Sequence, residues 1–302
     1  MKIAAGIVLF NPDKDRFERC LTVILNQVDL VILYDNVGNC ERYLPKDDPR
    51  ILYITDHCNK GLAYALNRIM DEAQQLGFEW IITMDQDTIL PQNLVEEYQK
   101  YMSIPNVAIL APQVIDRRRR YLEIERCVDE IRDIDFCITS ASCTNLKIWS
   151  DLGRFDEWLF IDFIDNDYCK RVKLNGLRIL QLTNMVIDQE FGKIELKSPR
   201  VAGFWLWLSN ITGNKNIAKL SYKKSVSPMR VYYVHRNLLY LNKKFKKYGG
   251  IGYENFYGKN FVDFLMYFTL PSIARADRKF EVLKAAIKGL RDGRKSEASE
   301  II

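Results

Sequence analysis

The sequence Trp80-Ile81-Ile82-Thr83-Met84-Asp85-Gln86-Asp87 joins a short apolar run to two carboxylates. A run of this length predicts a strand that is covered on both faces, as in parallel sheets. Ligands of open α/β sheets bind outside the carboxyl ends of the strands, so Asp85 and Asp87 fall where we expect the chemistry. An Asp-x-Asp pair there suits a hard cation such as Mg²⁺ or Mn²⁺. Taken alone, the pair is also compatible with a polar turn.

In residues 1–90, apolar runs alternate with segments of helical spacing. Apolar runs predict strands over residues 2–10, 30–34, 50–55 and 80–84, and helical spacing predicts helices over residues 13–27 and 62–76. Connections of this kind imply parallel strand pairing. The chain has neither Gly-x-Gly-x-x-Gly nor Gly-x-x-x-x-Gly-Lys-Ser/Thr, which disfavours dinucleotide redox and P-loop ATPase chemistry.

Polar residues follow two of these strands. Asp35 comes directly after the second strand, where its carboxylate either binds a base or a ribose or accepts hydrogen bonds from its own turn. Asn59 is the expected N-cap of the helix over residues 62–76. Backbone N–H groups at that helix start suit a diphosphate, and this is the functional interpretation of Asn59, Gly61 and Asn67.

A second group of carboxylates lies in the aromatic segment 153–171. The pattern predicts a helix over residues 91–102, strands over residues 107–115 and 134–142, and a helix over residues 166–175. Asp165 stands beside Phe163 and Ile164, so partial desolvation favours its taking a proton as a general base. The alternative is that Asp162 or Asp165 only caps the helix. A metal-like and a base-like acidic centre together fit metal-assisted transfer to a hydroxyl.

Composition narrows the class of protein. The 302 residues are 48% hydrophobic and 27% charged, which is ordinary for a globular chain with a real core. Seven cysteines without Cys-x-x-Cys spacing and only two histidines disfavour a zinc site and indicate a reducing cytoplasm. The apolar N-terminus lacks a small-residue cleavage site, and no apolar stretch reaches the length of about 18 residues that spans a bilayer. We therefore expect neither a signal peptide nor a transmembrane helix.

Charge is segregated along the chain. Residues 1–195 carry 23 Lys+Arg against 32 Asp+Glu, whereas residues 196–253 carry 12 Lys+Arg and no acidic residue. Such a basic segment suggests an anionic surface or a polyanionic ligand. Nothing in the sequence matches a zinc finger, an RNA-recognition motif or a helix-turn-helix, so we do not expect nucleic acid as the partner.

These motifs together resemble family-2 glycosyltransferases of the GT-A fold, and within them the rhamnosyltransferase-like branch that often has Asp-Gln-Asp as its metal motif. The resemblance covers about residues 1–195, with a weaker match at residues 228–245. It implies an α/β GT-A catalytic domain over residues 1–200. A basic, aromatic-rich and mainly helical C-terminal extension is expected over residues 201–302.

The resemblance also implies roles for single residues. Asp85 and Asp87 would hold Mg²⁺ or Mn²⁺ against the donor diphosphate, and Asp35 would bind the nucleotide base. Asn59 and Gly61 would lie beside the nucleotide.

Residues 155–171 look like the acceptor and base motif of the family. This likeness makes Asp165 the catalytic base and lets Asp167 and Arg171 support its helix at the substrate site. Arg236, within a Tyr-Tyr-x-x-Arg-Asn pattern, is a candidate for binding a phosphate of the donor or of a lipid acceptor, with a structural ion pair as the alternative. Many relatives carry a His shortly before a Gly after the final core strand. Here Gln189 or Glu190 takes that place.

The implied activity is inverting transfer from a nucleoside-diphosphate sugar to a hydroxyl of a saccharide or lipid-diphosphate-linked acceptor, in bacterial cell-surface polysaccharide synthesis. The first expected donor is dTDP-rhamnose, and glucosyl, galactosyl or other hexosyl transfer from a UDP-sugar is the alternative. From other classes, a sugar-phosphate nucleotidyltransferase would normally show a Gly-rich N-terminal loop that is not found here, and a basic non-catalytic adaptor would not need the carboxylates.

The composition of the C-terminal third of the chain predicts where the protein is located in the cell. Aromatic residues at 204–208 and 253–268, together with the basic segment, are typical of interfacial elements. We expect a cytoplasmic protein at the inner face of the plasma membrane, in peripheral contact with anionic lipid. Packing of these aromatic residues on the core, or in a homodimer, is the alternative.

Overall fold

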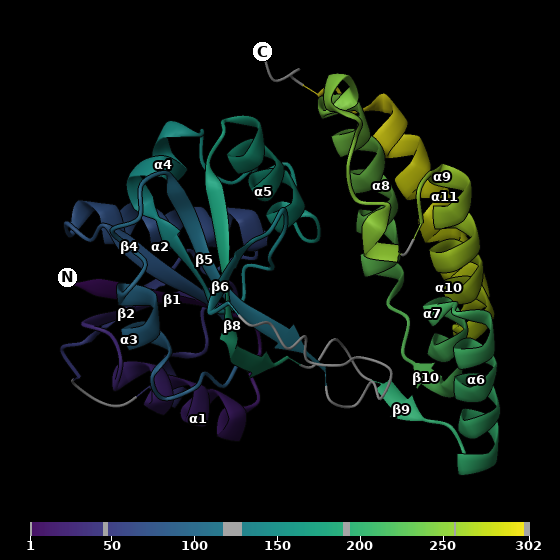
Figure 1. Ribbon diagram of the computed structural model, residues 1–302, viewed down its shortest axis with the longest axis horizontal. Coiled ribbons are helices and arrows are strands. Elements are labelled where there is room, and N and C mark those ends of the chain that lie inside the picture. The colour runs from purple at the N-terminus through teal and green to yellow at the C-terminus, as the bar shows by residue number, and fades with distance from the viewer. Residues whose placement is uncertain (1, 45–47, 117–128, 190–193, 257, 299–302) are drawn as a thin grey trace. The chain divides into compact units, whose positions relative to one another are not determined.

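The computed structural model describes residues 2–44, 48–116, 129–189, 194–256 and 258–298 (Figure 1). The chain forms two compact units, of which the first comprises Met1–Ile115 and Ile124–Gln189 and the second Asp116–Glu123 and Glu190–Ile302. The first unit contains the large sheet, and the second is mainly helical. The assignment of catalysis to residues 1–200 and of an accessory role to residues 201–302 stays a prediction.

Parallel strands form one half of the large sheet. Within the described residues the sheet has eight strands in the order β3-β2-β1-β4-β7-β5-β8-β6. The parallel half consists of β1 (Ile3–Leu9), β2 (Leu30–Asp35), β3 (Ile51–Thr55) and β4 (Trp80–Asp85), connected through α1 (Lys14–Leu25), the 3₁₀ turn η1 (Glu41–Tyr43) and α2 (Leu62–Gln75). Asp35 pairs with Leu9 and Thr55, and Asp85 pairs with Val8. The carboxyl ends of these strands therefore meet at one edge, and the predicted β-α-β-β-α-β order is confirmed.

The other half of the sheet mixes strand directions. Strand β7 (Ser142–Asn145) runs antiparallel to β4 and to β5 (Val107–Ile115), whereas β8 (Arg178–Asp188) runs parallel to β5 and antiparallel to β6 (Ile131–Asp133). The helices of this half are α3 (Leu94–Gln99), α4 (Leu146–Asp151) and α5 (Ile164–Leu174). Because β7 is antiparallel, its first residue, Ser142, pairs with Thr83. The residues just before β7 are thereby brought to the end of β4.

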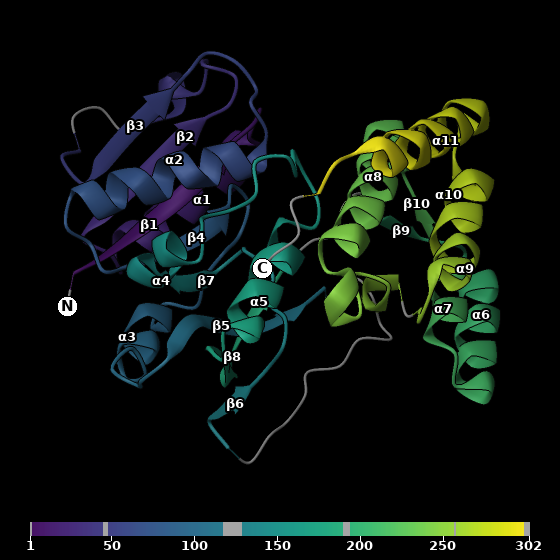
Figure 2. The ribbon, with the colours of Figure 1, turned by 90° about the horizontal axis from the view of Figure 1, so that it is seen from above.

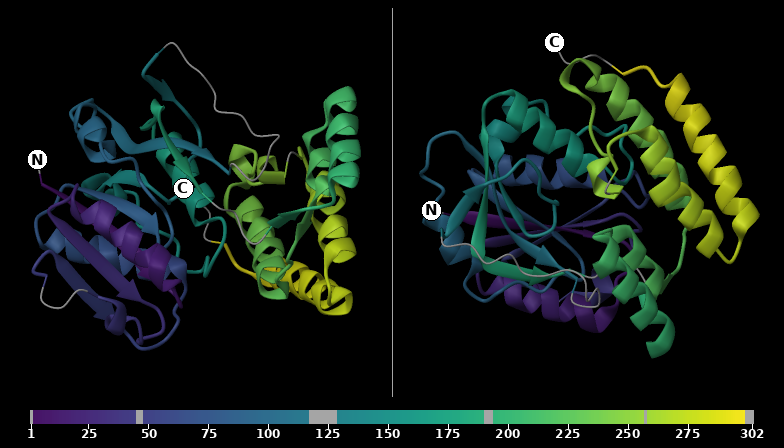
Figure 3. Two further views of the ribbon diagram at one scale, coloured as in Figure 1. Left: turned by 90° about the horizontal axis from the view of Figure 1, so that it is seen from below. Right: turned by 45° about the vertical axis from the view of Figure 1, so that its right-hand side comes forward.

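Helices cover both faces of the parallel strands because successive side chains of a strand point to opposite faces. The odd-numbered residues of β1 share one apolar core with α1 and α3. On the opposite face α2 approaches β1 so closely that a Cβ on Gly6 would stand 2.2 Å from Cγ2 of Ile69. Figure 2 shows α2 over one face of these strands, and the left view of Figure 3 shows α1 over the other.

Two expected elements of the first unit are wrong in extent. The strand over residues 134–142 does not form, because Ala141 has a φ of 62° and the Ser142 N–H donates to the Thr139 carbonyl in a turn. Strand β7 therefore begins only at Ser142. The helix over residues 91–102 shrinks to α3, since Lys100 and Tyr101 turn to hydrogen bonds with carbonyls only three residues earlier.

The second unit packs two long helices, α8 (Pro228–Lys244) and α11 (Lys279–Lys295), against each other (Figure 3). A Cβ on Gly289 or Gly293 of α11 would stand 2.4 or 2.6 Å from a carbonyl oxygen of α8, so only glycine allows this approach. The remaining elements are α6 (Pro199–Thr212), α7 (Lys215–Ala218), α9 (Phe261–Phe264), a π-helix η5 (Leu265–Thr269), α10 (Leu270–Arg275), the 3₁₀ turns η2 (Lys219–Ser221), η3 (Lys246–Tyr248) and η4 (Glu254–Phe256), and a ribbon of β9 (Ile194–Leu196) with β10 (Tyr222–Lys224).

His235 lies in the core of the second unit. Its Nδ1 is 2.7 Å from the Val231 carbonyl oxygen, and its Nε2 is 2.8 Å from the Thr269 hydroxyl. Burial lowers the pKa of His235 to about 4, so the imidazole is neutral near pH 7. His235 thus joins α8 to the π-helix η5. In the described part of the chain no helix is both long and apolar enough to cross a membrane.

Candidate functional site

Asp85 is the last residue of strand β4, and a turn anchored by hydrogen bonds follows it. The Gln86 side chain accepts a hydrogen bond from the Phe10 N–H at 2.8 Å and donates to the Phe10 carbonyl at 3.2 Å, which fastens the turn to the end of β1. A carboxylate oxygen of Asp87 lies 3.9 Å from Nη2 of Arg16 on α1, and the Asp87 side chain is 36% exposed. Anchors on β1 and α1 therefore present two carboxylates, one residue apart, at the edge where the parallel strands end.

Asp85 also belongs to a ring of hydrogen bonds with three buried side chains. Its N–H donates to the Ser140 hydroxyl at 3.3 Å, and the hydroxyls of Ser140 and Thr88 are 2.7 Å apart. Thr88 donates to Oε1 of Gln189 at 2.6 Å, and Nε2 of Gln189 donates to Oδ2 of Asp85 at 2.9 Å. Sequence reasoning left Gln189 and Glu190 open and did not find Thr88. Gln189 makes this contact, and Glu190 lies outside the described residues.

Asp165 stands in the first turn of α5, which begins two residues earlier than expected. The helix follows Asp162 and Phe163, which have left-handed φ values of 69° and 67°. Phe163 is the N-cap, so the alternative that Asp162 or Asp165 caps this helix is wrong. Oδ1 of Asp165 accepts the Asn166 N–H at 2.9 Å. Two consecutive non-glycine residues in this region are costly, and such strain concentrates at functional sites.

The pKa of Asp165 is raised to about 7. Burial is the main cause, the negative charges of Asp162 and Asp85 add to it, and the Asn166 N–H opposes it. The charges of Asp85 and Asp165 thus interact across the site. A carboxylate with this pKa is suited to take a proton near neutral pH.

Asn67 of α2 holds the segment that leads to Asp165. Its two side-chain N–H groups donate to the Phe155 carbonyl at 3.0 Å and to the Glu157 carboxylate at 2.8 Å, and its side-chain oxygen Oδ1 accepts the Phe155 N–H at 3.0 Å. Asn67 is buried. The side-chain amide of Asn67 is therefore bonded to the chain itself, and the expected role of Asn67 beside a diphosphate stays a prediction.

The start of α2 differs from the expectation. Gly61, with a φ of 96°, is the N-cap, whereas the side-chain oxygen Oδ1 of Asn59 accepts the Gly61 N–H at 3.0 Å just before the helix. The Leu62 N–H donates to the Phe160 carbonyl at 2.7 Å. Asn59 is therefore not the cap, and the first N–H of the helix binds the segment 155–163 instead of facing outward to a diphosphate.

Gly61→Ala is expected to destabilise the first unit by about 2 to 4 kcal/mol, since it combines two costs. A side chain at a φ of 96° is strained, and a Cβ there would lie 2.8 Å from the Phe160 carbonyl oxygen. Gly77→Ala is the matched control because Gly77 has a φ of 80° with nothing within 4 Å of its Cβ position. Urea unfolding measures both variants. Equal losses in the two would show that contact with Phe160 costs nothing.

Asp35 is buried at the end of β2 with both oxygens engaged. Oδ1 accepts the Val37 N–H at 2.8 Å, and Oδ2 accepts the Asn39 and Cys40 N–H groups and the Tyr53 hydroxyl at 2.7 to 2.8 Å. Burial acts to raise the pKa of Asp35, but these hydrogen bonds outweigh it and lower the pKa to about 2. In this structure the carboxylate shapes its own loop, which was one of the two interpretations left open by the sequence.

Arg171 is buried and faces the protein interior. Its guanidinium donates to Oδ2 of Asp167 at 2.9 and 2.7 Å and to the carbonyls of Leu152 and Arg154 at 2.6 and 2.5 Å. These bonds fasten α5 to the turn that precedes the segment 155–163.

Arg236 belongs to the second unit, on α8. Its Nε donates to Oδ1 of Asn237 at 2.9 Å, and its guanidinium lies 4.7 Å from the ring centre of Tyr233. The role of Arg236 toward a phosphate stays a prediction.

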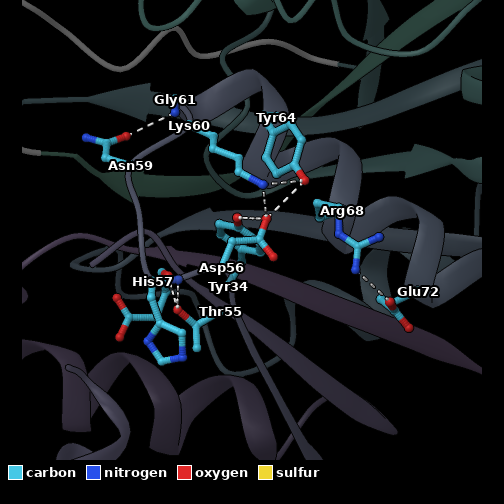
Figure 4. A network of polar contacts seen from close by, with 11 residues as sticks. Tyr34, Thr55, Asp56, His57, Asn59, Lys60, Gly61, Tyr64, Arg68 and Glu72 are labelled. Carbon is cyan, nitrogen blue, oxygen red and sulfur yellow. Dashed lines mark hydrogen bonds and ion pairs between the residues drawn. The ribbon is translucent and has the colours of Figure 1, made fainter. Parts of the chain in front are cut away.

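A polar network that sequence reasoning missed stabilises the loop after β3 (Figure 4). Oδ2 of Asp56 accepts hydrogen bonds from Tyr34 at 2.9 Å, Lys60 at 2.8 Å and Tyr64 at 3.0 Å. Lys60 is the main cause that lowers the pKa of Asp56 to about 2. The network joins β2, the loop and α2, and so fixes the backbone that carries Asn59 and Gly61.

Asp85 and Asp87 fit a cation that a substrate completes. Among the residues that the structure describes, no three His, Cys, Asp or Glu side chains gather into a self-sufficient metal site. Mg²⁺ is usually bound through one or two carboxylates together with waters and substrate phosphates, and Mn²⁺ also prefers oxygen ligands. A pair of neighbouring carboxylates, one of them orientated by a buried amide, supplies the protein share of such a site.

Comparison with known sequences agrees with the resemblance drawn from the motifs. Residues 5–156 match the family model described as "Glycosyl transferase family 2". A curated relative, dTDP-rhamnosyl transferase RfbF from Shigella flexneri, is 24% identical, with 80% of each chain covered.

Solved structures share the fold. S. aureus TarS 1-349 aligns with a TM-score of 0.51 at 12% identity, covering 97% of this chain and 89% of that one. A mannosyltransferase from Pyrobaculum calidifontis, in complex with GDP-Man and Mn²⁺, aligns with a TM-score of 0.52 at 12% identity, covering 98% and 76%. The expected GT-A α/β fold with a helical C-terminal part is confirmed.

Proposed function

The chain belongs to glycosyl transferase family 2, and we propose that it is a metal-dependent, inverting rhamnosyltransferase with dTDP-rhamnose as its donor. The observation that carries the proposal is the anchored turn after β4, which presents Asp85 and Asp87 where the parallel strands end, together with Asp165 in the first turn of α5, whose raised pKa suits a base. The likeness to a dTDP-rhamnosyl transferase supports rhamnose as the sugar. Another hexose carried by UDP is the second candidate. The family match favours transfer over the nucleotidyltransferase and adaptor alternatives.

Asp165 would act as the general base in a single displacement. As the acceptor hydroxyl oxygen bonds to the anomeric carbon, its proton passes to Asp165, and the bond from that carbon to the diphosphate oxygen breaks with its electrons staying on the nucleoside diphosphate. Attack opposite the leaving group inverts the anomeric centre. General-base help is typically worth about 10²- to 10⁴-fold in rate. Asn67 and Arg171 would be positioning residues, because both fasten the backbone around Asp165.

Asp85 and Asp87 would hold Mg²⁺ or Mn²⁺, which supplies positive charge next to the departing diphosphate. Oδ2 of Asp85 already accepts a hydrogen bond from Gln189, which sets the direction of the carboxylate. The turn that carries Asp85 and Asp87 is fastened to Phe10 through the Gln86 side chain, so it would hold both carboxylates in place without rearrangement. Preorganisation of this kind lets a charged site act without a reorganisation cost.

We propose a saccharide or lipid-diphosphate-linked acceptor used at the inner face of the plasma membrane, in cell-surface polysaccharide synthesis. The acid-free basic segment 196–253 supports an anionic acceptor or surface. Arg236 would then bind a phosphate of the donor or the acceptor. Asp35, Asn59 and Gly61 would shape the nucleotide pocket through the backbone that they fix. A homodimer is a further proposal for the second unit.

The test of this function is turnover of a nucleotide-sugar panel by the full chain. The panel contains dTDP-rhamnose, UDP-glucose, UDP-galactose and UDP-GlcNAc, each with Mn²⁺ or with EDTA, and nucleoside diphosphate release is measured. Release from dTDP-rhamnose that EDTA abolishes is the expected result. Preference for a UDP-sugar would replace the donor and keep the reaction. A protein that binds none of the nucleotides with Mn²⁺ would contradict the proposed function.

The pH dependence should follow the raised pKa of Asp165. Since the base must be deprotonated, kcat/KM is expected to fall about tenfold per pH unit below a midpoint near 7 and to level off above it. Initial rates of nucleoside diphosphate release between pH 5 and pH 9, at saturating Mn²⁺, measure this profile. A rate that stays level from pH 9 down to pH 5 would show that burial does not raise the pKa of this carboxyl far above its ordinary value of 3.8.

A further inference from the structure

Helix α6 is apolar and largely exposed, which is unusual for a helix outside a core. Its fourteen residues, Pro199–Thr212, include one charged residue, Arg200, and only Ala202 and Ser209 of the helix are buried. A helix that is apolar on all sides is normally enclosed by protein or lipid. Contiguous exposed apolar surface of this kind marks an interaction site.

The exposed apolar side chains of α6 form one stripe opposite its buried side. At about 100° per residue, positions 201, 204, 207 and 211 fall within about 120° of the circumference, and positions 202 and 209 lie on the other side. The stripe consists of Val201, Phe204, Trp207 and Ile211, exposed to 42%, 51%, 57% and 63%. A second exposed stripe, Val262, Met266 and Leu270, follows α9, η5 and α10 in steps of four residues.

The basic residues around α6 indicate an anionic partner. Lys197 and Arg200 stand at its start, Lys215 and Lys219 follow its end, and residues 196–253 contain no acidic residue. Aromatic and aliphatic side chains flanked by cations are the composition of a helix that lies in the headgroup region of an anionic bilayer. A homodimer interface would explain the apolar stripe but not the absence of acidic residues over 58 positions.

We propose that α6 inserts its stripe of Val201, Phe204, Trp207 and Ile211 into the surface of an anionic lipid bilayer. The helix lies in the interface plane, with Lys197, Arg200, Lys215 and Lys219 close to lipid phosphates. This inference names the surface for the membrane contact proposed above. It does not depend on which sugar is transferred, because vesicle binding is measured without donor.

The test is co-sedimentation of the full chain with vesicles of phosphatidylcholine, with and without phosphatidylglycerol. Wild type is expected to bind the anionic vesicles, and Phe204→Ser/Trp207→Ser is expected to bind them about tenfold or more weakly. Leu76→Ser is the matched control, since Leu76 is an exposed apolar residue of the first unit. Circular dichroism checks that each variant is folded.

Several results would overturn the proposal. The proposal fails if the wild-type protein does not sediment with anionic vesicles, or if it binds neutral vesicles equally well. It also fails if the double variant binds as well as Leu76→Ser. A dimer that light scattering detects without lipid, and that Phe204→Ser/Trp207→Ser dissociates, would assign the stripe to a second copy of the chain.

A second, independent observation concerns Gln189. Its Oε1 accepts from the Thr88 hydroxyl at 2.6 Å, which leaves the amide N–H groups to face Oδ2 of Asp85 at 2.9 Å. Ser140 closes the ring between Thr88 and the Asp85 N–H. Both oxygen and nitrogen of the amide thus have defined partners, and the Asp85 carboxylate, which when ionised can only accept, fixes the N–H end of the amide toward itself.

The geometry points to Gln189 as a positioning residue that orientates Asp85 for the cation and is not itself a ligand. Its oxygen, the only atom of the amide that can bind a metal, is directed to Thr88. Partners that orientate a ligand typically change metal affinity by about 10- to 100-fold when they are removed. This inference rests on the proposed metal role of Asp85.

Mn²⁺ titration in the presence of dTDP, followed by the electron paramagnetic resonance of free Mn²⁺, tests the inference. Gln189→Glu places a carboxylate against Asp85 and is expected to weaken Mn²⁺ binding at least tenfold. Thr88→Val removes the hydroxyl bound to the amide oxygen and keeps the backbone bond from residue 88 to the Asp85 carbonyl, so it is expected to weaken binding by a smaller factor. Gln75→Glu on the exposed end of α2 is the control.

The outcomes separate the two hypotheses. Wild type that binds no Mn²⁺ would contradict the metal site itself. Wild-type binding with an unchanged or tighter Gln189→Glu complex would overturn only the positioning role, because a new carboxylate ligand strengthens binding where a lost orientating bond weakens it. Thermal unfolding of each variant excludes a general loss of structure as the cause.

Discussion

Asp165→Asn is expected to lower kcat by about 10²- to 10⁴-fold and to leave donor binding intact. The substitution keeps the shape of the side chain, and its Oδ1 can still accept the Asn166 N–H, so α5 should be unchanged. What is lost is the ability to take the acceptor proton. Single-turnover release of nucleoside diphosphate measures the chemical step, and titration with dTDP and Mn²⁺ measures binding.

The same variant should be more stable than wild type above pH 7. The folded pKa of about 7 lies above the ordinary value of 3.8, so the stabilising contribution of the neutral carboxyl is present at low pH and is lost as pH rises through about 7. Removing the charge is therefore expected to gain about 2 to 4 kcal/mol at pH 8 and little at pH 4. Urea unfolding at both pH values measures the gain.

Asp151→Asn provides the control for both measurements, since Asp151 is an exposed carboxylate at the end of α4. It should change neither turnover nor the pH dependence of stability. An Asp165→Asn enzyme with near wild-type kcat would remove Asp165 as the base, whatever the stability result. Stability that is unchanged at pH 8 would show that the carboxyl is well solvated in the folded protein.

Local pattern was enough to predict the parallel half of the fold. The runs that became β1 to β4 are short and apolar, and they end in polar residues. Amphipathic helices form two of the three connections between these strands, so the sequence predicted that the strands are parallel and that their carboxyl ends lie together. Asp35, Asp85 and Asp87 are at or next to strand ends for the same reason. The strand predicted over residues 134–142 was wrong because the left-handed φ of Ala141 cannot be recognised from an apolar pattern.

The functions of amide side chains could not be predicted in this way. Gln86, Asn67 and Gln189 each form a hydrogen bond with a residue at least 76 positions away in the chain. Local spacing in the sequence cannot predict such pairs. Asn67 was expected only as part of a helix start that suits a diphosphate, and its bonds to Phe155 were not foreseen. Gln189 came into view only as a departure from the family pattern, and its partners Thr88 and Ser140 lie in turns that a periodicity argument ignores.

Asp85→Asn is the second substitution with a large expected effect. Loss of a ligand charge next to the departing diphosphate should cost several kcal/mol of transition-state stabilisation, or about 10³-fold in kcat/KM. EDTA should abolish wild-type turnover, and Mn²⁺ should restore it. The variant is expected to stay slow at every Mn²⁺ concentration. Asp135→Asn, at a side chain that is 94% exposed, is the control.

Asp85→Asn should also change the titration of Asp165 in the metal-free protein. The negative charge of Asp85 is one cause of the raised pKa of Asp165, so in EDTA its removal is expected to move that pKa to lower pH, which the pH dependence of urea unfolding measures. Asp85 replaced by Asn thus slows the reaction and makes the base easier to ionise, which a merely destabilised enzyme would not do. A lower rate with an unmoved pKa of Asp165 in EDTA would mean that the two carboxylates do not share one site, and the proposed mechanism requires that they do.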